Sequence, residues 1–160
     1  MTSPASRHVS IVSAVGCLAL YLLAMSSSAL ADPGAKTINT TQGFDETVGR
    51  LEKAIIDNKM SLVAEASASK GAASRGIKIP GNTVLMVFRN DYAVRMLKAS
   101  VPAGIEAPLR IYVTENANGS NITYRSPSAT FAPYRNAELD ALASELDPIF
   151  NKIVADATKP

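Results

Sequence analysis

The pattern of apolar and polar positions predicts an amphipathic helix in each half of the chain. From Phe44 to Lys59, apolar residues recur at the three- and four-residue spacing of one helical face. Asp45 and Glu46 lie in its first turn, where acidic side chains favour the helix dipole. Asn136 is suited to cap a second helix, which Pro148 should kink because it has no N–H to donate. The apolar stripe of this second helix is Leu139, Leu142, Leu146, Ile149 and Ile153.

Short runs of residues before the first helix and between the two helices predict strands. Residues 36–42 are Thr-rich, which favours a first strand, and residues 60–66 alternate with the period of a half-buried second one. The run 83–88 is apolar on both faces, which is typical of a central strand covered on both sides. Between the second strand and this central strand, residues 67–82 are rich in Ser, Ala, Gly and Lys and predict a loop that holds a short helical turn.

Two further strands, joined by a tight turn, are predicted within residues 108–125. Asn118-Gly119 is a favoured sequence for a two-residue hairpin turn. The return strand over 120–125 adds Arg125 to the polar face of the hairpin. The core face of the first strand is predicted to carry Leu109, Ile111 and Val113. Its opposite face carries Arg110, Tyr112 and Thr114.

The order of these elements predicts a single α+β domain over residues 36–158. A mainly antiparallel sheet of about five strands would pack against two main helices. Asn90 or Asp91 is suited to cap a short additional helix that ends near Ala99. The chain contains no internal repeat and no second hydrophobic unit.

An apolar run near the amino terminus predicts a secretory signal peptide over residues 1–31. Arg7 and His8 precede the run 9–25, and Ala29-Leu30-Ala31 supplies the small residues of a cleavage site, so we expect cleavage between Ala31 and Asp32. The expected location is therefore the periplasm or the extracellular space, with no membrane attachment after cleavage. Because the run reaches the lower limit of a membrane span, an uncleaved anchor is the alternative.

The composition limits the chemistry of the exported chain, because that chain would lack cysteine and histidine. The 160 residues include one Cys and one His, and both Cys17 and His8 lie in the predicted signal peptide. After cleavage, no Cys-His or Ser-His-Asp nucleophilic site and no Cys- or His-ligated metal is possible, so we expect no cofactor and no metal. The chain has 16 Lys and Arg against 14 Asp and Glu. This small basic excess argues against a nucleic-acid partner.

Four spaced blocks resemble a known family. They are Gly43–Leu51, Thr83–Asp91, Ala107–Ile111 and Tyr124–Pro127. Together they are similar to the bacterial and archaeal domain-of-unknown-function family 302 over about residues 36–135, followed by the helix 136–158. The resemblance implies a TATA-binding-protein-like β-α-β4-α order, dimers and no established activity. The family's Phe-Gly-Asn-Pro is Phe88-Arg89-Asn90-Asp91 here, and its frequent histidine is missing near Ser67 to Ser69, so no site residue is transferred from the family.

The polar face of the predicted hairpin carries the sharpest candidate for a binding site. Alternation places Arg110, Tyr112 and Arg125 on this face, and Arg89 and Asn90 would join them if the end of the strand 83–88 converges there. Two or three guanidinium groups can bind a carboxylate or another small anion bidentately. The alternative is a solvated surface whose arginines pair with nearby carboxylates, for which the candidates are Glu65 and Glu115.

The same face can also be interpreted as a contact with a second copy or with an envelope protein. A homodimer contact would be centred on Tyr112, Tyr124, Leu85 and Val87. The alternative is that Leu85 and Val87 belong to the core. Asn-x-Ser/Thr sequences begin at Asn39, Asn118 and Asn121, and we interpret them as incidental.

Acid–base catalysis is the remaining alternative. It would have to use Glu106, Glu115 or Tyr124, and none of these has a partner at a diagnostic spacing. We therefore expect no catalytic residue. The sequence predicts an exported, non-catalytic domain that binds a small anionic ligand or a protein partner.

Overall fold

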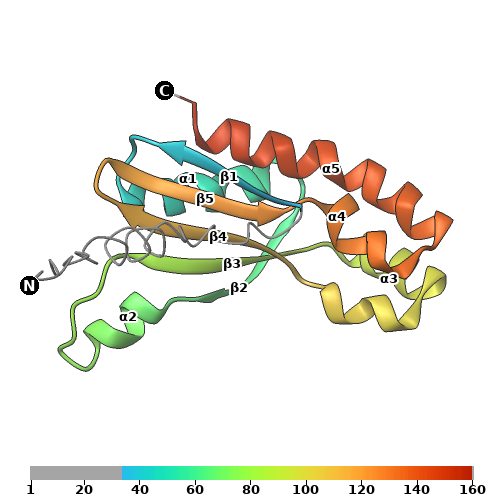
Figure 1. Cartoon of the computed structure of the whole chain (residues 1–160), viewed down its shortest axis with the longest axis horizontal. Helices are drawn as coiled ribbons and strands as arrows, with labels where there is room; N and C mark the ends of the chain where they lie inside the picture. Colours follow the sequence, from blue (N-terminus) through green and yellow to red (C-terminus); the bar gives the residue numbers. More distant parts are fainter. Residues whose placement is uncertain (1–33, 160) are drawn as a thin grey trace, which may run out of the picture. The chain divides into compact units, whose positions relative to one another are not determined.

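The structure, a computed structural model, describes residues 34–159, and the predicted signal peptide lies outside them. Five antiparallel strands form one sheet in the spatial order β1-β5-β4-β3-β2, with β4 at its centre (Figure 1). The strands are β1 (Ala35–Thr40), β2 (Ser61–Ala66), β3 (Asn82–Phe88), β4 (Leu109–Asn116) and β5 (Gly119–Arg125). The predicted antiparallel sheet is therefore confirmed.

Two long helices cover one face of this sheet, which we call the covered face. They are α1 (Phe44–Asp57) and α5 (Ala137–Ala157), which pack against each other. The short helices are α2 (Ala68–Ala73), α3 (Asn90–Ala99), η1 (Val101–Glu106), α4 (Pro127–Phe131) and η2 (Ala132–Tyr134). The arrangement confirms the α+β class. None of the helices within residues 34–159 is long and apolar enough to cross a membrane.

The core lies between the covered face and the two long helices. Its large, fully buried side chains include Leu51, Ile55, Leu85, Ile111, Val113, Ile122, Phe150 and Ile153. Burying one such side chain contributes about 1.5–3 kcal/mol. The predicted stripe of α5 is confirmed, with Ile149 only partly buried. Phe150 was not part of that stripe, yet it is fully buried and stacks on Tyr124 with ring centres 6.3 Å apart.

Strand β3 differs from its prediction as a strand covered on both sides. Leu85 and Val87 are buried, but the alternate residues Val84, Met86 and Phe88 are only half-buried. The reason is that α1 and α5 lie on the same side of the sheet and contact each other. The opposite side, which we call the open face, is not covered by either long helix.

Strand β2 alternates differently from its prediction because its register with β3 shifts between Leu62 and Ala64. After this bulge, Glu65 lies opposite Leu85 and therefore on the side of the covered face. There its carboxylate accepts a hydrogen bond of 2.8 Å from the hydroxyl of Thr83, which is buried. One irregular residue thus moves a charged side chain to the opposite side of the sheet.

The hairpin between β4 and β5 turns at Ala117 and Asn118, immediately before Gly119. Gly119 has a φ of +141°, and a Cβ at this position would overlap the backbone of Thr40 and Thr41. Glycine is therefore required here both for its backbone angle and for the close approach of the chain. The N–H of Asn118 donates to Oδ1 of Asn116 over 2.8 Å, which fixes the turn.

The final helix begins as predicted. Oδ1 of Asn136 accepts hydrogen bonds from the N–H groups of Glu138 and Leu139, at 2.9 and 3.1 Å. Nδ2 of the same side chain donates to the carbonyl of Ala99 over 3.0 Å, so the cap also ties α5 to the end of α3. Helix α5 continues through Pro148 to Ala157.

Candidate functional site

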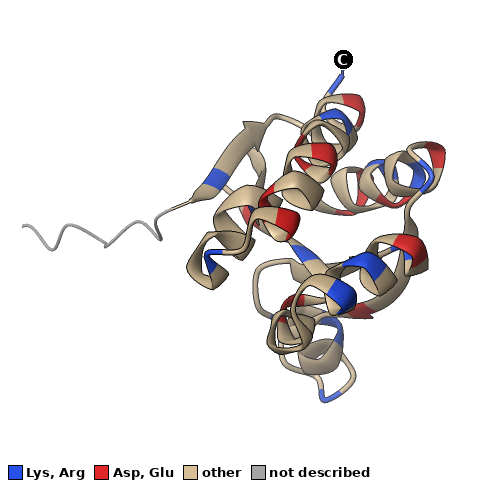
Figure 2. Cartoon of the chain, turned by 90° about the vertical axis from the view of Figure 1, so that its right-hand side faces the viewer, with Lys and Arg blue, Asp and Glu red and all other residues tan. Residues whose placement is uncertain are grey.

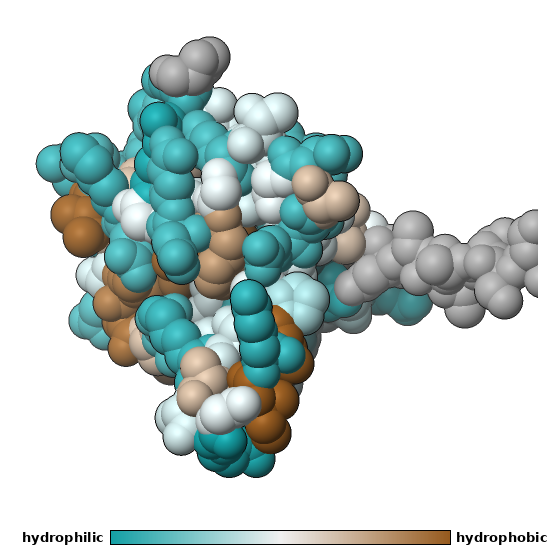
Figure 3. All heavy atoms as spheres, turned by 90° about the vertical axis from the view of Figure 1, so that its left-hand side faces the viewer, coloured by the Kyte–Doolittle hydropathy of each residue, from teal (hydrophilic) through white to brown (hydrophobic). Residues whose placement is uncertain are grey.

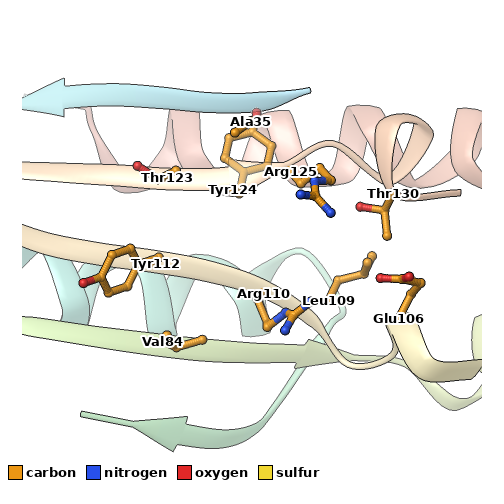
Figure 4. A pocket seen from close by; sticks show the side chains of 10 residues that line it. All are labelled: Ala35, Val84, Glu106, Leu109, Arg110, Tyr112, Thr123, Tyr124, Arg125 and Thr130. Atoms are coloured by element: carbon orange, nitrogen blue, oxygen red, sulfur yellow. The ribbon is translucent and has the colours of Figure 1, made fainter. Parts of the chain in front are cut away.

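Two arginines lie opposite each other on the open face, at one end of the central hairpin. Ile111 pairs with Tyr124 and Tyr112 pairs with Thr123. Continuing this register by one step places Arg110 opposite Arg125. Both side chains line one hollow from neighbouring strands (Figure 4). The alternation of the hairpin therefore brings together three of the predicted site residues, Arg110, Tyr112 and Arg125.

The two arginines line a hollow of about 250 Å³, which we call the arginine groove. Tyr112 lies toward one end, and Glu106 of η1 and Thr130 of α4 lie at the other (Figure 4). Among residues 34–159, the lining is Ala35, Val84, Glu106, Leu109, Arg110, Tyr112, Thr123, Tyr124, Arg125 and Thr130. Strand residues thus form the floor, and the segments flanking the hairpin form the end wall.

The charge of the groove favours an anion. Arg110 is exposed, and within residues 34–159 its side chain has no hydrogen bond or ion pair. The carboxylates suggested as partners bind elsewhere, since Glu65 pairs with Lys70 at 2.7 Å and Glu115 accepts the N–H of Gly81 at 2.7 Å. A ligand carboxylate beside Arg110 would supply the hydrogen-bond acceptor that the described residues do not.

Charges elsewhere on the domain are distributed differently. On the helices, blue and red segments lie close together (Figure 2). Arg95 on α3 binds Glu145 on α5 through two hydrogen bonds of 2.8 and 2.6 Å, and Lys152 binds Asp156 at 2.6 Å. These helix cations have partners within the protein, whereas Arg110 depends on solvent or a ligand.

Among residues 34–159, Glu106 is the one carboxylate that lines the groove. Its Oε1 accepts a hydrogen bond of 3.0 Å from the hydroxyl of Tyr134. Desolvation, together with this bond to Glu106, raises the pKa of Tyr134, so the phenol keeps its proton and remains a donor. The groove therefore combines two guanidinium groups with one carboxylate that already has a partner.

Arg89 and Asn90 do not join the groove. The guanidinium of Arg89 lies 4.0 Å from the ring centre of Tyr92 and donates to both carboxylate oxygens of Asp91, at 2.7 and 3.0 Å. Arg89, rather than Asn90 or Asp91, is the N-cap residue of α3, and Asn90 is exposed in its first turn. The hydrogen bonds from Arg89 lower the pKa of Asp91. This cluster serves the start of α3 and lies outside the groove lining.

The residues suggested for a dimer centre do not share one face. Leu85 and Val87 are buried core residues on the covered face. Tyr124 is 4% exposed, and its hydroxyl donates to Asn151 of α5 over 2.8 Å. Burial is the main cause that raises the pKa of Tyr124. Of the four suggested residues, Tyr112 alone presents its side chain to the open face.

The suggested acid–base groups do not converge either. Glu106 lies at the closed end of the arginine groove, whereas Glu115 lies near the hairpin turn at the opposite end of β4. The hydroxyl of Tyr124 points into the covered side. Among residues 34–159, no cluster of three or more His, Cys, Asp or Glu side chains is arranged to hold a metal ion.

Sequence reasoning did not identify Glu106 and Thr130 as groove residues. A signal was available, because Glu106 lies three positions before the first residue of β4 and Thr130 follows β5 closely. In a hairpin, the start of the first strand and the end of the second lie at the same end of the sheet. The segments that hold Glu106 and Thr130 are therefore expected to lie beside Arg110 and Arg125.

Comparison with known proteins finds one family. The model of "Domain of unknown function DUF302" matches residues 36–157, so the likeness extends beyond the predicted residue 135 to the end of α5. A solved structure, the "uncharacterized conserved protein DUF302 from Bacillus stearothermophilus", superposes with a TM-score of 0.70 at 16% identity. The match covers 79% of this chain and 99% of that chain, and it shows the shared fold. No curated protein matches this chain.

Proposed function

This chain belongs to the DUF302 family, and we propose that it is an exported, non-catalytic domain that binds a small anionic ligand in the arginine groove. The observation that carries the proposal is the placement of Arg110 and Arg125 across from each other in one hollow, with Arg110 lacking a partner among the described residues. Export is supported by the sequence pattern of residues 7–31.

The dimensions and polarity of the groove favour a carboxylate-bearing ligand. A planar guanidinium can donate two parallel hydrogen bonds to a carboxylate, and Arg110 is exposed to a ligand that enters from the open face. The volume of about 250 Å³ suits a small molecule. The ring of Tyr112 and the side chain of Val84 add apolar surface beside the charged end. Binding requires no covalent step.

The test is isothermal titration of the purified chain with sodium glucuronate and with citrate. We expect Arg110→Gln to weaken binding at least tenfold, because a hydrogen bond to a charged group contributes about 1.5–3 kcal/mol. Arg75→Gln is the matched control, since Arg75 is exposed beyond α2 and lies outside the groove. It removes the same charge and should leave binding unchanged.

Two outcomes would overturn the proposal. One is the absence of binding by the unaltered chain. The other is an equal loss in both variants, because a general effect of net charge would then explain the result. If the open face instead joins two copies, Arg110→Gln would change the sedimentation mass of the chain without an effect on anion binding.

A further inference from the structure

A second hollow lies on the open face, at the hairpin end of the sheet. It has a volume of about 490 Å³, and we call it the amide hollow. Its polar side chains are Asn39, Thr40, Thr41, Asn116, Asn118 and Asn121, none of which is charged. The three Asn-x-Ser/Thr sequences of the chain all begin in this hollow. Figure 3 faces this end of the molecule, where hydrophilic side chains cover much of the surface and apolar side chains form separate patches.

The amide hollow and the arginine groove follow one another along β5. Asn121, Thr123 and Arg125 are alternate residues of this strand and therefore project from the same face. Thr123 lines the groove and Asn121 lines the amide hollow. The four-residue separation of Asn121 and Arg125 corresponds to about 13 Å along a strand. A single elongated ligand can therefore contact both hollows.

The asparagines are arranged to offer both donors and acceptors. Nδ2 of Asn116 donates to Oδ1 of Asn121 over 2.6 Å, which orients Asn121 so that its own amide nitrogen is left to donate. Within residues 34–159, the side chains of Asn39 and Asn118 make no hydrogen bond. Side-chain amides that donate and accept at one site match the hydroxyl groups of a sugar, which do the same.

We propose that the open face binds an acidic oligosaccharide. Its carboxylate-bearing ring would lie between Arg110 and Arg125, and its neutral rings would extend past Tyr112 to the amide hollow. Tyr112 is 41% exposed and stands between the two ends, where its ring offers a flat surface to a sugar ring. The proposal rests on the function proposed above and names its ligand class.

The distribution of charge argues against a regular polyanion. Among the described residues that line this track, the cations are Arg110 and Arg125, both in the arginine groove, and the amide hollow adds none. A nucleic acid carries a phosphate at every step, so its second and third phosphates would meet only amides and hydroxyls. A ligand with one charged end and a neutral, hydroxyl-rich remainder fits this distribution.

The test uses three probes in isothermal titration of the purified chain. They are glucuronic acid, xylotriose, and an aldotriouronic acid in which one glucuronic acid is linked to two xyloses. We expect the acidic trisaccharide to bind at least tenfold tighter than either other probe, because it alone reaches both hollows. Arg110→Gln should weaken both acids, whereas Asn39→Ala should weaken only the trisaccharide, to the affinity of glucuronic acid.

Asn90→Ala is the matched control, because Asn90 is an exposed asparagine on α3 outside both hollows. If glucuronic acid binds through Arg110 but the trisaccharide binds no tighter, the inference is overturned and the proposed function stands. The same conclusion follows if Asn39→Ala and Asn90→Ala behave alike. If neither acid binds, the proposed function fails as well.

Discussion

The two faces of the sheet use neighbouring residues for opposite purposes. On β4, Ile111 is fully buried beneath the helices, whereas the next residue, Tyr112, is 41% exposed on the open face. The covered face is mainly apolar and is packed by α1 and α5. The open face carries arginines, threonines and asparagines that line two hollows. The two-residue period of a strand can therefore assign core packing to one face of an element and leave its other face available for binding.

If the two faces have separate roles, the largest effect on the free energy of unfolding is expected at Ile111, on the covered face. Ile111→Ala should lower the free energy of unfolding by about 2–5 kcal/mol, because it leaves a cavity in the core. Tyr112→Ala, one residue away, should lower it by less than about 1 kcal/mol. Urea denaturation of both variants measures the contrast. Similar losses in the two variants would show that the open face also contributes to stability, and the separation of roles would be wrong.

The hairpin was predictable because its two faces differ in polarity. Leu109, Ile111 and Val113 alternate with polar residues, so one period-two argument places both the core and Arg110 correctly. Strand β3 offered no such contrast. Val84 and Met86 are as apolar as the buried Leu85, and no pattern in the run indicates that one side lacks a long helix. Which face the helices cover is decided by tertiary packing.

The candidate site was likewise predictable only where residues of contrasting polarity alternate along a strand. Arg110, Tyr112 and Arg125 followed from alternation, whereas Arg89 was grouped with them on its proximity to the end of β3. Alternation applied to β3 places Arg89 on the side of Leu85 and Val87, and this is the side on which it contacts Tyr92. The amide hollow could not be recognised, because Asn39 and Asn121 come together only through the pairing of β1 with β5.

An intermediate effect on the free energy of unfolding is expected at Asn136, which caps α5 over the covered face. Asn136→Ala should lower the free energy of unfolding by about 0.5–2 kcal/mol, because it removes the acceptor for two N–H groups of the first turn. Asn136→Ser is the control, since serine keeps an N-cap acceptor but loses the bond to Ala99. Thermal and urea unfolding provide the measurement.

The same variants also test whether the two faces act independently. Anion binding by Asn136→Ala should be unchanged below its unfolding range, because the cap supports the covered face and lies outside the arginine groove. A loss of binding in step with the loss of stability would show that the groove depends on the position of α5. In that case recognition and stability would share one structural unit.

The smallest effect is expected at Glu65, the charged residue that the bulge in β2 moves to the covered side. Hydrogen bonds from Lys70 and then Thr83 lower the pKa of Glu65 below its ordinary value of 4.5. Because the folded-state pKa is the lower one, the stabilisation is present above pH 4.5 and is lost as the pH falls through the folded-state pKa. Glu65→Gln should therefore cost less than about 1 kcal/mol at pH 7, and progressively less toward pH 3, since exposed ion pairs are weak.

Urea denaturation of the unaltered chain and of Glu65→Gln across this pH range provides the measurement. Lys70→Gln is the informative companion, because it removes the largest cause of the lowered pKa and should reduce the same pH dependence. If the difference between the unaltered chain and Glu65→Gln stays constant from pH 7 to pH 3, the carboxylate contributes through its shape and not its charge.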